Sequence, residues 1–330
     1  MKRSHSVVTG GAGFVGSHLC DFLLAQGHHV TCVDNLLTGK TENIAHLRGN
    51  PRFRFIKHDV IKGLPRLLRM RGSNRTLPRF FPSTDYVFHL ASPASPVGYM
   101  KNSIETILTN SMGSLQLLEY CRKRPHTKFL FASTSEVYGN PAVHPQVETY
   151  WGNVNSFGPR SCYDESKRLG EAIIYEYIHK FGVNARIIRI FNTYGPRLNE
   201  TDGRVVSNLI TQALNGESLT IYGDGSQTRS FCFVSDLVRG IWAAISTPDT
   251  VGQIYNLGNP QETTIKDFAK TVLELCGKHG AKIEHKPLPT DDPIRRKPDI
   301  SKAKKVLGWE PQVSLKEGLK QTIEYYRSRI

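Results

Sequence analysis

The sequence predicts an α/β fold in which a doubly wound parallel sheet is joined to a smaller C-terminal domain. Two observations carry this prediction. Short apolar strands alternate with helical stretches up to Ile190, and after Asn192 the chain changes to loops rich in Gly, Asn and Pro that are broken by short helices. Alternating strands and helices are typical of a parallel sheet with helices on both faces, and right-handed crossovers make such a sheet doubly wound.

Local patterns justify the elements in chain order. Strands are expected at residues 6–9, 29–33, 53–58, 85–90, 128–133, 184–190 and 254–257. Helical apolar spacing follows the first strand, and further helices are expected at 205–214 and 235–246. We expect residues 1–191 and 230–260 to form the sheet domain. Residues 192–229 and 261–330 then form the smaller domain over the mouth of the sheet, with a Pro-rich loop at 287–298.

The charge balance is strongly basic. Lys and Arg number 43 against 29 Asp and Glu, which gives a net charge of +14. Arginines at 66, 69, 71, 75 and 79 lie in a stretch without acidic residues. We interpret this stretch as a solvated loop, because no nucleic-acid-binding motif accompanies it. A substrate that carries a diphosphate and a carboxylate accounts for part of the remaining positive charge.

Cysteines and hydropathy indicate the compartment. The six cysteines form no CxxC pair and no zinc-ligand spacing with histidine, so we expect reduced thiols and no metal. No apolar run approaches the roughly 20 residues of a membrane span. A strand-like segment follows the first five residues directly, which leaves no room for a signal peptide. We therefore expect a cytoplasmic protein that binds neither membrane nor nucleic acid.

A glycine-rich turn follows the first expected strand. Gly10, Gly13 and Gly16 are spaced across the junction between this strand and the next helix. Glycine is needed where a backbone turns sharply, approaches a pyrophosphate or packs closely on a sheet. The free N–H groups of the helix N-terminus favour phosphate. Such turns also occur without a ligand, so the surrounding elements decide the interpretation.

The ends of the second and third strands supply that context. Asp34 lies roughly 20 residues beyond the turn, where a carboxylate accepts hydrogen bonds from ribose hydroxyls and repels a 2′-phosphate. The pattern therefore predicts a sheet of the Rossmann type that binds NAD rather than NADP. Asp59 is a candidate partner of the adenine amino group; a carboxylate that only caps a strand-end turn is the alternative.

Two polar clusters are candidates for chemistry. Tyr163 and Lys167 lie one helical turn apart on one face. A nearby ammonium, together with the positive charge of a nicotinamide, favours the phenolate that a tyrosine base requires. Thr134, Ser135 and Glu136 end an earlier strand, where doubly wound sheets bind their ligands. A surface Tyr–Lys pair and a polar strand cap are the alternatives to these two interpretations.

Several segments extend these motifs along the chain. They include Ser-Pro-Ala-Ser at 92–95, Thr-Ser-Glu-Val-Tyr-Gly at 134–139, Tyr-Asp-Glu at 163–165 and Arg-Lys-Pro-Asp at 296–299. With the glycine turn they resemble the extended short-chain dehydrogenase/reductase family over essentially the whole chain. Within this family the Ser-Pro-Ala-Ser and Arg-Lys-Pro-Asp segments are similar to the UDP-glucuronate decarboxylases, which make UDP-xylose. The resemblance assigns NAD to the larger domain and the nucleotide sugar to the smaller substrate-binding domain.

The resemblance implies a three-step reaction. Tyr163 takes the proton of the sugar 4-hydroxyl while NAD takes the C4 hydride, and Lys167 holds the nicotinamide ribose. The 4-keto acid then loses CO₂, and NADH reduces the ketone. Thr134, Ser135 and Glu136 position the substrate and manage protons, and the role of Glu136 is open between ordering the sugar carboxylate and relaying protons. Arg296 is the implied partner of the sugar carboxylate or the acid that reprotonates C5, and its neighbour Arg295 is the alternative.

Further contacts are implied by the same resemblance. The cofactor set comprises Gly10, Gly13, Phe14, Val15, Gly16, Asp34, Asn35, Thr38, Gly39, Asp59, Val60, Leu90, Ala91, Tyr163, Lys167 and Thr193. The substrate set comprises Ser92, Asn192, Arg204, Tyr222, Gln227, Arg229 and Arg296, with Arg204 left open between substrate and cofactor. The chain departs from the family pattern at a long 65–84 stretch and at three single positions, Pro65, Leu108 and Ser166.

Other functions remain open at this point. A 4,6-dehydratase would carry Asp where Ser135 stands, because expelling water needs an acid. A 4-epimerase shares the oxidation but must rotate the keto sugar, and a decarboxylase can also release the 4-keto product. A non-catalytic NAD-sensing or nucleic-acid-binding module is disfavoured by Tyr163, Lys167 and Glu136. Apolar residues on more than one side of helices near 104–121 and 163–180 predict a homodimer.

Overall fold

A computed structural model describes residues 4–65, 84–278, 281–287 and 295–330. Most of the Pro65–Thr84 stretch and its basic cluster therefore lie outside the described residues, as does most of the Pro-rich loop. Among the described residues, no helix has the length and apolar character that crossing a bilayer requires.

The larger part of the molecule is built on a seven-stranded sheet in which every pair of neighbours is parallel. Apart from the edge strand β3, the strands are mostly buried because helices cover both faces, as their near-continuous apolar sequences predict. All seven expected strands are present with ends that shift by at most a residue. Across the sheet they are β11 (Ile254–Leu257), β6 (Ala185–Ile190), β5 (Lys128–Thr134), β4 (Tyr86–His89), β1 (His5–Thr9), β2 (His29–Asp34) and β3 (Phe53–Lys57).

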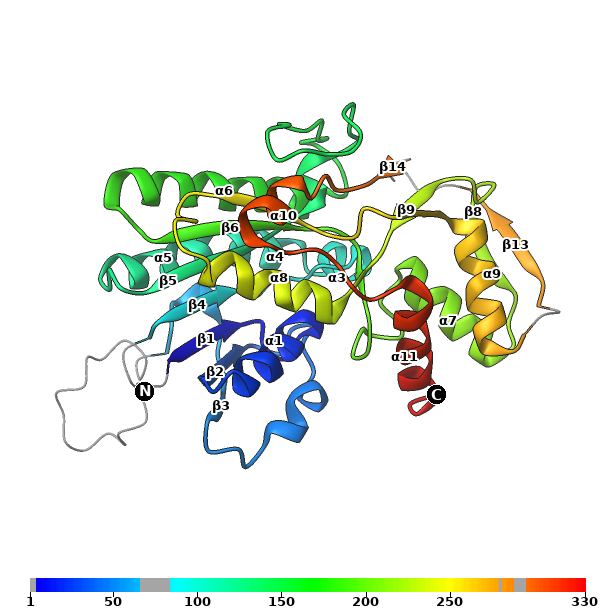
Figure 1. Cartoon of the computed structure of the whole chain (residues 1–330), viewed down its shortest axis with the longest axis horizontal. Coiled ribbons are helices and arrows are strands. Elements are labelled where there is room, and N and C mark those ends of the chain that lie inside the picture. The colour runs from blue at the N-terminus through cyan, green and yellow to red at the C-terminus, as the bar shows by residue number, and fades with distance from the viewer. Residues whose placement is uncertain (1–3, 66–83, 279–280, 288–294) are drawn as a thin grey trace.

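Two groups of helices cover the sheet (Figure 1). One face is covered by α1 (Phe14–Ala25) and α8 (Val234–Ser246). The other is covered by α4 (Ser103–Leu108), a π-helical turn η3 (Thr109–Gly113), α5 (Ser114–Arg122) and α6 (Ser161–Phe181). The expected continuous helix near 104–121 is thus divided, and the wider turn brings Thr109 to the cavity described below. Shorter elements are α3 (Pro96–Lys101), η1 (Thr41–Leu47), η2 (Val60–Lys62) and η4 (Ser135–Tyr138).

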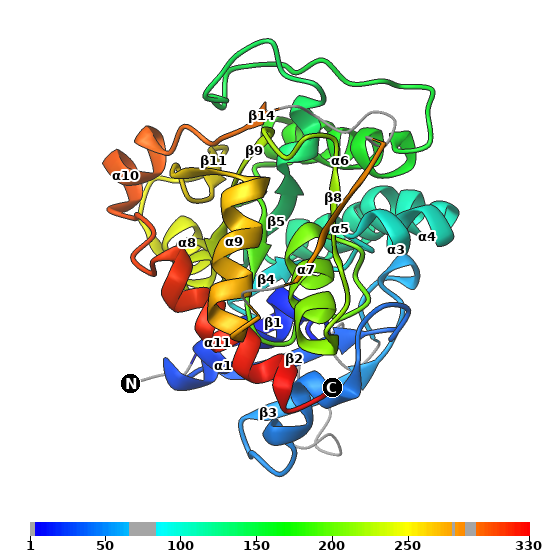
Figure 2. The same cartoon turned by 90° about the vertical axis from the view of Figure 1, so that its right-hand side faces the viewer.

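A smaller group of elements lies beyond the carboxyl ends of the strands (Figures 1 and 2). Its helices are α7 (Val205–Asn215), α9 (Ile265–Cys276) and α11 (Leu315–Arg327). Its sheets pair β8 (Leu219–Tyr222) with β13 (Ile283–Lys286), and β9 (Thr228–Ser230) with β12 (Glu262–Thr264) and β14 (Arg295–Arg296). The division into two domains stays a prediction. The helix α10 (Ser301–Leu307) contacts α8 and β11, and β7 (Thr193–Tyr194) pairs with β10 (Cys232–Phe233).

The strand order places a crevice beside β1. The chain proceeds from β1 to β2 and β3 in one direction and to β4, β5, β6 and β11 in the other. Ligands of such sheets bind outside the carboxyl ends of the strands at this switch point. The glycine turn after β1 and the segment after β4 meet there, since a Cβ at Gly10 would lie 2.7 Å from the nitrogen of Ala91.

Buried histidines make the fold sensitive to acid. Burial lowers the pKa of His5 from 6.5 to about 4, and it lowers that of His89 to about 3. The His5 side chain shares a 2.8 Å hydrogen bond with the Thr31 hydroxyl on β2, and the His89 side chain shares one of 2.9 Å with the Thr9 hydroxyl on β1. A depressed folded-state pKa means that the stabilisation is complete above pH 6.5 and is lost as the pH falls from 6.5 towards 4.

We therefore expect the thermal midpoint to fall steeply between pH 6.5 and 4. The His5→Gln variant keeps a hydrogen-bonding side chain but cannot be protonated, and its midpoint should fall less over this interval. A shift of this size corresponds to about 3 kcal/mol for a single group. Scanning calorimetry on both proteins measures the difference, and equal pH slopes would contradict the assignment to His5.

Candidate active site

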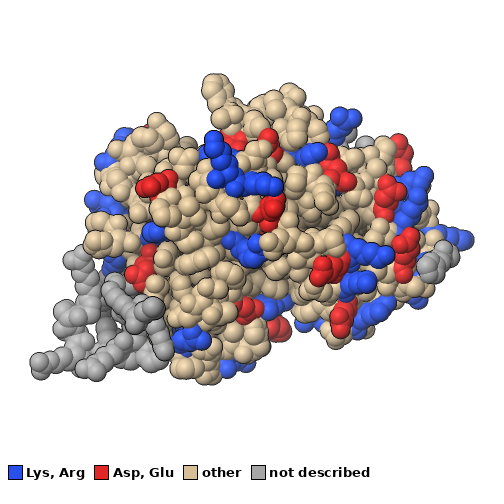
Figure 3. Space-filling view, in the orientation of Figure 1, with Lys and Arg blue, Asp and Glu red and all other residues tan. Residues whose placement is uncertain are grey.

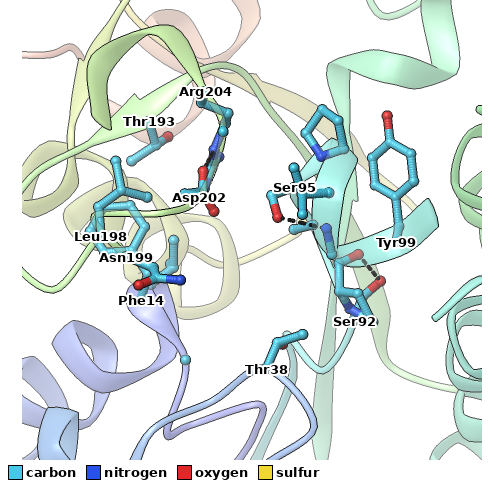
Figure 4. Close-up of a pocket in the computed structure, with 18 of the residues that line it drawn as sticks. Phe14, Thr38, Ser92, Ser95, Tyr99, Thr193, Leu198, Asn199, Asp202 and Arg204 are labelled. Carbon is cyan, nitrogen blue, oxygen red and sulfur yellow. Dashed lines mark hydrogen bonds and ion pairs between the residues drawn. The ribbon is translucent and has the colours of Figure 1, made fainter. Parts of the chain in front are cut away.

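One cavity of about 1000 Å³ extends from the glycine turn to the smaller group of elements. Figure 4 shows Ser92, Ser95 and Tyr99 on one side of it, and Asn199 and Arg204 on the other. Every residue that the sequence analysis names for catalysis, cofactor or substrate lines this cavity, except Arg295, the alternative to Arg296. Residues far apart in the chain are thus brought together as predicted. Their individual roles stay predictions.

The glycine turn is shaped for a close approach of phosphate. Gly10 has a φ of +73°, and a Cβ at Gly16 would lie 2.1 Å from the Gly10 carbonyl oxygen. No side chain larger than hydrogen fits either position. The helix α1 begins directly after Gly13, which makes no side-chain cap, so its first N–H groups are available to an anion. These residues fit the pyrophosphate of a dinucleotide.

The residues at the ends of β2 and β3 fit an adenosine. The Asp34 carboxylate is buried and accepts hydrogen bonds from the backbone nitrogens of Ala12, at 3.0 Å, and Leu36, at 2.8 Å. One bond to each oxygen leaves lone pairs for ribose hydroxyls. Asp59 accepts bonds from the nitrogen of Ile61 and the side-chain amide of Asn35. It therefore caps the η2 turn and lines the cavity at once.

Replacing Asp34 is expected to change cofactor choice. Asp34→Ala removes both the ribose acceptor and the charge that repels a 2′-phosphate. Affinity for NAD should fall by about tenfold or more, and the preference for NAD over NADP should shrink. Calorimetric titration with each cofactor measures both effects. Asp34→Asn, which keeps an acceptor without the charge, should lose selectivity but less affinity; unchanged binding of both cofactors would place the ribose elsewhere.

Tyr163 and Lys167 are both buried on α6, beside the end of β5. The Lys167 ammonium donates to the carbonyl oxygen of Ala132 at 2.7 Å and lies 5.8 Å from the centre of the Tyr163 ring. The Tyr163 ring also stacks on Tyr99, with ring centres 4.8 Å apart and planes 5° from parallel. The base candidate is thus held in one orientation.

Burial controls the protonation of this pair. It raises the pKa of Tyr163 well above its ordinary value, although a hydrogen bond with Thr134 lowers it in part. It also lowers the pKa of Lys167 to about 7. The lowered pKa expected for Tyr163 therefore requires the bound cofactor as well as the protein. The positive charge of a nicotinamide is needed to favour the phenolate in so dry a position.

Glu136 lies between two arginines. One carboxylate oxygen pairs with Arg296 and the other with Arg160. Burial alone would raise the pKa of Glu136, but the charges of Arg296 and Arg160 outweigh it and lower the pKa. Arg296 also donates to the hydroxyl of Ser135 at 3.3 Å and the carbonyl oxygen of Gly139 at 2.8 Å. Glu136 is therefore a carboxylate at neutral pH.

The structure distinguishes Arg296 from its neighbour. Arg296 is 2% exposed and lines the cavity, whereas Arg295 is exposed and does not line it. The two residues form β14, in which successive side chains point to opposite faces. β14 pairs in parallel with β9, and Arg296 lies beside Arg229 in the register. Strand pairing thus turns the first of two equivalent arginines away from the cavity.

The remaining residues of the substrate set form the outer end of the cavity. Arg204 pairs with Asp202, as Figure 4 shows. The Gln227 side-chain amide donates to the backbone carbonyl oxygen of Tyr222 at 2.6 Å, which positions the Gln227 side chain. Arg229 is 9% exposed and donates to the Thr228 carbonyl oxygen at 2.9 Å. Two arginines and exposed hydrogen-bonding groups suit a nucleoside diphosphate.

Three residues were missed by reasoning from the sequence. Tyr99 stacks on Tyr163, Arg160 pairs with Glu136, and Asp164 is buried behind them. Arg160 and Asp164 lie in a segment that the resemblance covers, but no spacing rule assigned them a partner. A basic residue shortly before the Tyr–Lys helix was the available signal for Arg160.

Comparisons with known proteins agree with this geometry. Residues 6–258 match the family described as "NAD dependent epimerase/dehydratase family". The UDP-glucuronic acid decarboxylase 1 of Xenopus tropicalis is 51% identical over 99% of this chain and 73% of its own length. The UDP-glucuronic acid decarboxylase 6 of Arabidopsis thaliana is 50% identical over 98% of this chain and 89% of its own length.

A solved structure shares the fold and contains ligands. The UDP-glucuronic acid 4-epimerase of Bacillus cereus, in complex with UDP-glucuronic acid and NAD, superimposes with a TM-score of 0.86 at 32% identity. The match covers 99% of this chain and all of that one. These similarities establish that the chain belongs to the NAD-dependent epimerase/dehydratase family, in agreement with the glycine turn, the Asp34 carboxylate and the Tyr163–Lys167 pair described above.

Proposed function

We propose that this protein converts UDP-glucuronate to UDP-xylose and CO₂. One observation carries the proposal: the buried Arg296 is brought beside Glu136 and Ser135 in the cavity that also contains Tyr163. UDP-glucuronate differs from UDP-glucose by the carboxylate at C5, so its selection requires a cation or several hydrogen-bond donors at that point. The relatives at about half identity are named as decarboxylases of this substrate, which supports the same conclusion.

The oxidation step uses residues on α6 and β5. Bound NAD supplies the hydride acceptor for C4 and returns the hydride at the end of the cycle. Tyr163 accepts the proton of the 4-hydroxyl and later gives it back, and Thr134 holds the same oxygen by its hydroxyl. Lys167, fixed by the Ala132 carbonyl, orients the nicotinamide ribose and adds positive charge near the phenolate.

The decarboxylation step follows from the chemistry of the sugar. Oxidation places a ketone at C4, so the carboxylate on C5 is β to a carbonyl. The bond between C5 and the carboxylate breaks, its electron pair forms the C4–C5 double bond of an enolate, and CO₂ leaves. C5 then takes a proton. Arg296 orients the carboxylate before the bond breaks, and Glu136 stands next to it for the proton transfer.

Epimerisation is the second candidate. The solved structures with high similarity include 4-epimerases, among them a UDP-glucose 4-epimerase from Thermotoga maritima at 33% identity and a TM-score of 0.85. An epimerase must let the keto sugar rotate. The packing of Arg296 against Ser135 and Gly139 restricts that end of the cavity, which favours decarboxylation.

A single assay separates these outcomes. The protein is incubated with UDP-glucuronate and NAD, and CO₂ and the sugar nucleotides are followed together. Equal amounts of CO₂ and UDP-xylose are expected. CO₂ with a 4-keto pentose would indicate early release of the intermediate, whereas UDP-galacturonate without CO₂ would identify an epimerase. No change in the substrate would overturn the proposed function.

The proposal includes a homodimer. Of the apolar residues on α6 that suggested it, Ile174 is fully buried and Ile173, Tyr177 and Ile178 pack partly on the sheet side. Other apolar side chains of the same helical layer are exposed instead, namely Met100, Ile104, Ile107, Leu108, Met112, Leu169 and Tyr175. They lie on α3, α4, η3 and α6, which contact one another, and a second copy would cover them.

Light scattering at micromolar concentration is expected to give twice the mass of one chain. Ile104, at 62% exposed, lies in this layer, so Ile104→Glu should shift the protein towards the monomer. Val251→Glu, at an exposed apolar position outside the layer, serves as the matched control and should leave the mass unchanged. A wild-type monomer would contradict the dimer.

The proposed setting is the cytoplasm, with a nucleotide sugar as the partner. All six cysteines are free thiols, five of them buried, which suits a reducing compartment. Figure 3 shows Lys and Arg interspersed with Asp and Glu on the face in view, rather than gathered into one stripe. This distribution supports small anionic ligands over nucleic acid.

A further inference from the structure

The proposed reaction consumes one proton per turnover. The proton that Tyr163 removes from the 4-hydroxyl returns to the same oxygen when C4 is reduced. The proton that C5 takes after CO₂ leaves has no such source, because a carboxylate was lost as neutral CO₂. It must enter the cavity from solvent each time. This proton needs a route into a site that the cofactor closes on one side and the nucleotide closes on another.

A second cavity reaches Glu136 from behind. It has a volume of about 470 Å³ and is lined by Gly139, Asn140, Asn153, Val154, Asn155, Gly158 and Asp164, together with Glu136, Arg160 and Arg296. The last three residues also line the main cavity. They therefore form the wall between the two spaces, and the pairs that Glu136 makes with Arg160 and Arg296 close that wall. A polar space of this size holds several water molecules.

Asp164 lies at the second cavity only. It is 6% exposed, and its Oδ2 lies 4.0 Å from Nε of Arg160. Asp164 lines the second cavity. Its Oδ1 is buried and makes no hydrogen bond with any described residue. A carboxyl oxygen buried without a protein partner is costly unless it is protonated or bonded to water.

We infer that Asp164 supplies the proton for C5 through water in the second cavity, with Glu136 as the group that passes it across the wall. This inference rests on the proposed decarboxylation. The O–H bond of Asp164 breaks as its proton moves to water and on to Glu136; Glu136 gives a proton to C5, where the enolate electron pair forms the new C–H bond. Solvent then reprotonates Asp164. Asp164 is a positioning residue, since it acts through Glu136.

The electrostatics agree with this assignment. Burial first, and then the charge of the Glu136 carboxylate, raise the pKa of Asp164 to about 7 against the lowering effects of Arg160 and Arg296. Asp164 is thus protonated in part of the molecules at neutral pH, while Glu136, with its lowered pKa, passes a proton on readily. The titratable and charged groups around Asp164 are Glu136, Arg160, Arg296, Glu165, Tyr99, Cys162 and Tyr163.

The test compares pH profiles of Asp164→Asn and wild type. Wild-type kcat is expected to fall as the pH rises through 7, because Asp164 loses its proton. Lys167 has a lowered pKa near the same value, so the difference between the two profiles, and not the wild-type profile alone, identifies the group. Asp164→Asn should lower kcat for UDP-xylose by about 10²-fold, leave KM for UDP-glucuronate unchanged, and remove the Asp164 component of the pH profile. Asp164→Glu should restore part of both.

Two further variants guard against a folding effect. Glu165→Gln removes a carboxylate one residue further along α6, outside both cavities, and should keep the wild-type kcat. Because the Glu165 charge raises the pKa of Asp164, the Asp164 component of its pH profile should remain but shift to lower pH. Val154→Trp fills the second cavity without replacing a titratable group and should lower kcat at constant KM.

An Asp164→Asn variant with normal kcat and an unchanged profile would overturn the inference, as would one with raised KM alone. If that variant does not fold, normal kcat in Val154→Trp overturns it. A wild-type protein that releases no CO₂ from UDP-glucuronate would instead remove the proposed function itself.

Discussion

Replacing Tyr163 by phenylalanine is expected to lower kcat by about 10³-fold while NAD binding is retained. The ring stacks on Tyr99 and fills a buried position, so phenylalanine keeps the packing and removes only the hydroxyl. The hydroxyl is the base candidate, and it makes a hydrogen bond with Thr134, which the proposed mechanism places at the sugar 4-hydroxyl. Loss of the base blocks the first chemical step and therefore every later one.

Steady-state kinetics with UDP-glucuronate measure this loss, and calorimetry with NAD measures the retained binding. Tyr99→Phe is the matched control. It removes a hydroxyl from the stacked partner ring without removing the base, so its effect on kcat should be much smaller. Activity of Tyr163→Phe close to wild type would assign the proton transfer to another group.

Arg296→Ala is expected to reduce CO₂ release by at least about 10²-fold. The guanidinium is buried, pairs with Glu136 and contacts Ser135 and the Gly139 carbonyl, so its removal leaves a buried carboxylate with one cation fewer. If Arg296 acts after oxidation, NADH still forms while little CO₂ is released. If Arg296 only binds the substrate, both signals fall together through a raised KM.

The structure offers a matched control at the next residue. Arg295→Ala removes the same group from the opposite face of β14, where it is exposed, and should leave both NADH formation and CO₂ release unchanged. Arg296→Lys keeps the charge but cannot make paired bonds in one plane, so it should recover substrate affinity better than CO₂ release. Full CO₂ release with normal affinity in Arg296→Ala would remove this residue from the site.

Much of the fold follows from local sequence patterns. The seven parallel strands have nearly the expected bounds, because buried parallel strands have continuous apolar sequences. The glycine turn and Asp34 could be placed for a related reason: each occupies the end of a strand, and the ends of parallel strands meet at one edge. Such positions depend on chain order alone, which the sequence contains.

The missed features depend on contacts between distant segments. Arg160 and Arg296 both pair with Glu136, and nothing in the spacing of these three residues predicts it. The choice between Arg295 and Arg296 required the register of β14 against β9. The π-helical turn at Thr109–Gly113 has an ordinary helical sequence. The burial of Tyr163, which raises its pKa in the protein alone, likewise depends on several elements; the lowering by Lys167 and a bound nicotinamide together stays a prediction.

The pairing of β9 with β14 has a consequence for selectivity. Arg229 and Arg296 are partners in one parallel ladder, so backbone hydrogen bonds fix their separation. Under the proposed function one arginine serves the diphosphate and the other the sugar carboxylate. A substrate that engages both behaves like a bivalent ligand, because binding at one end raises the effective concentration of the other end at its own arginine. Glucuronic acid and UDP each present one end only, and neither gains from this geometry.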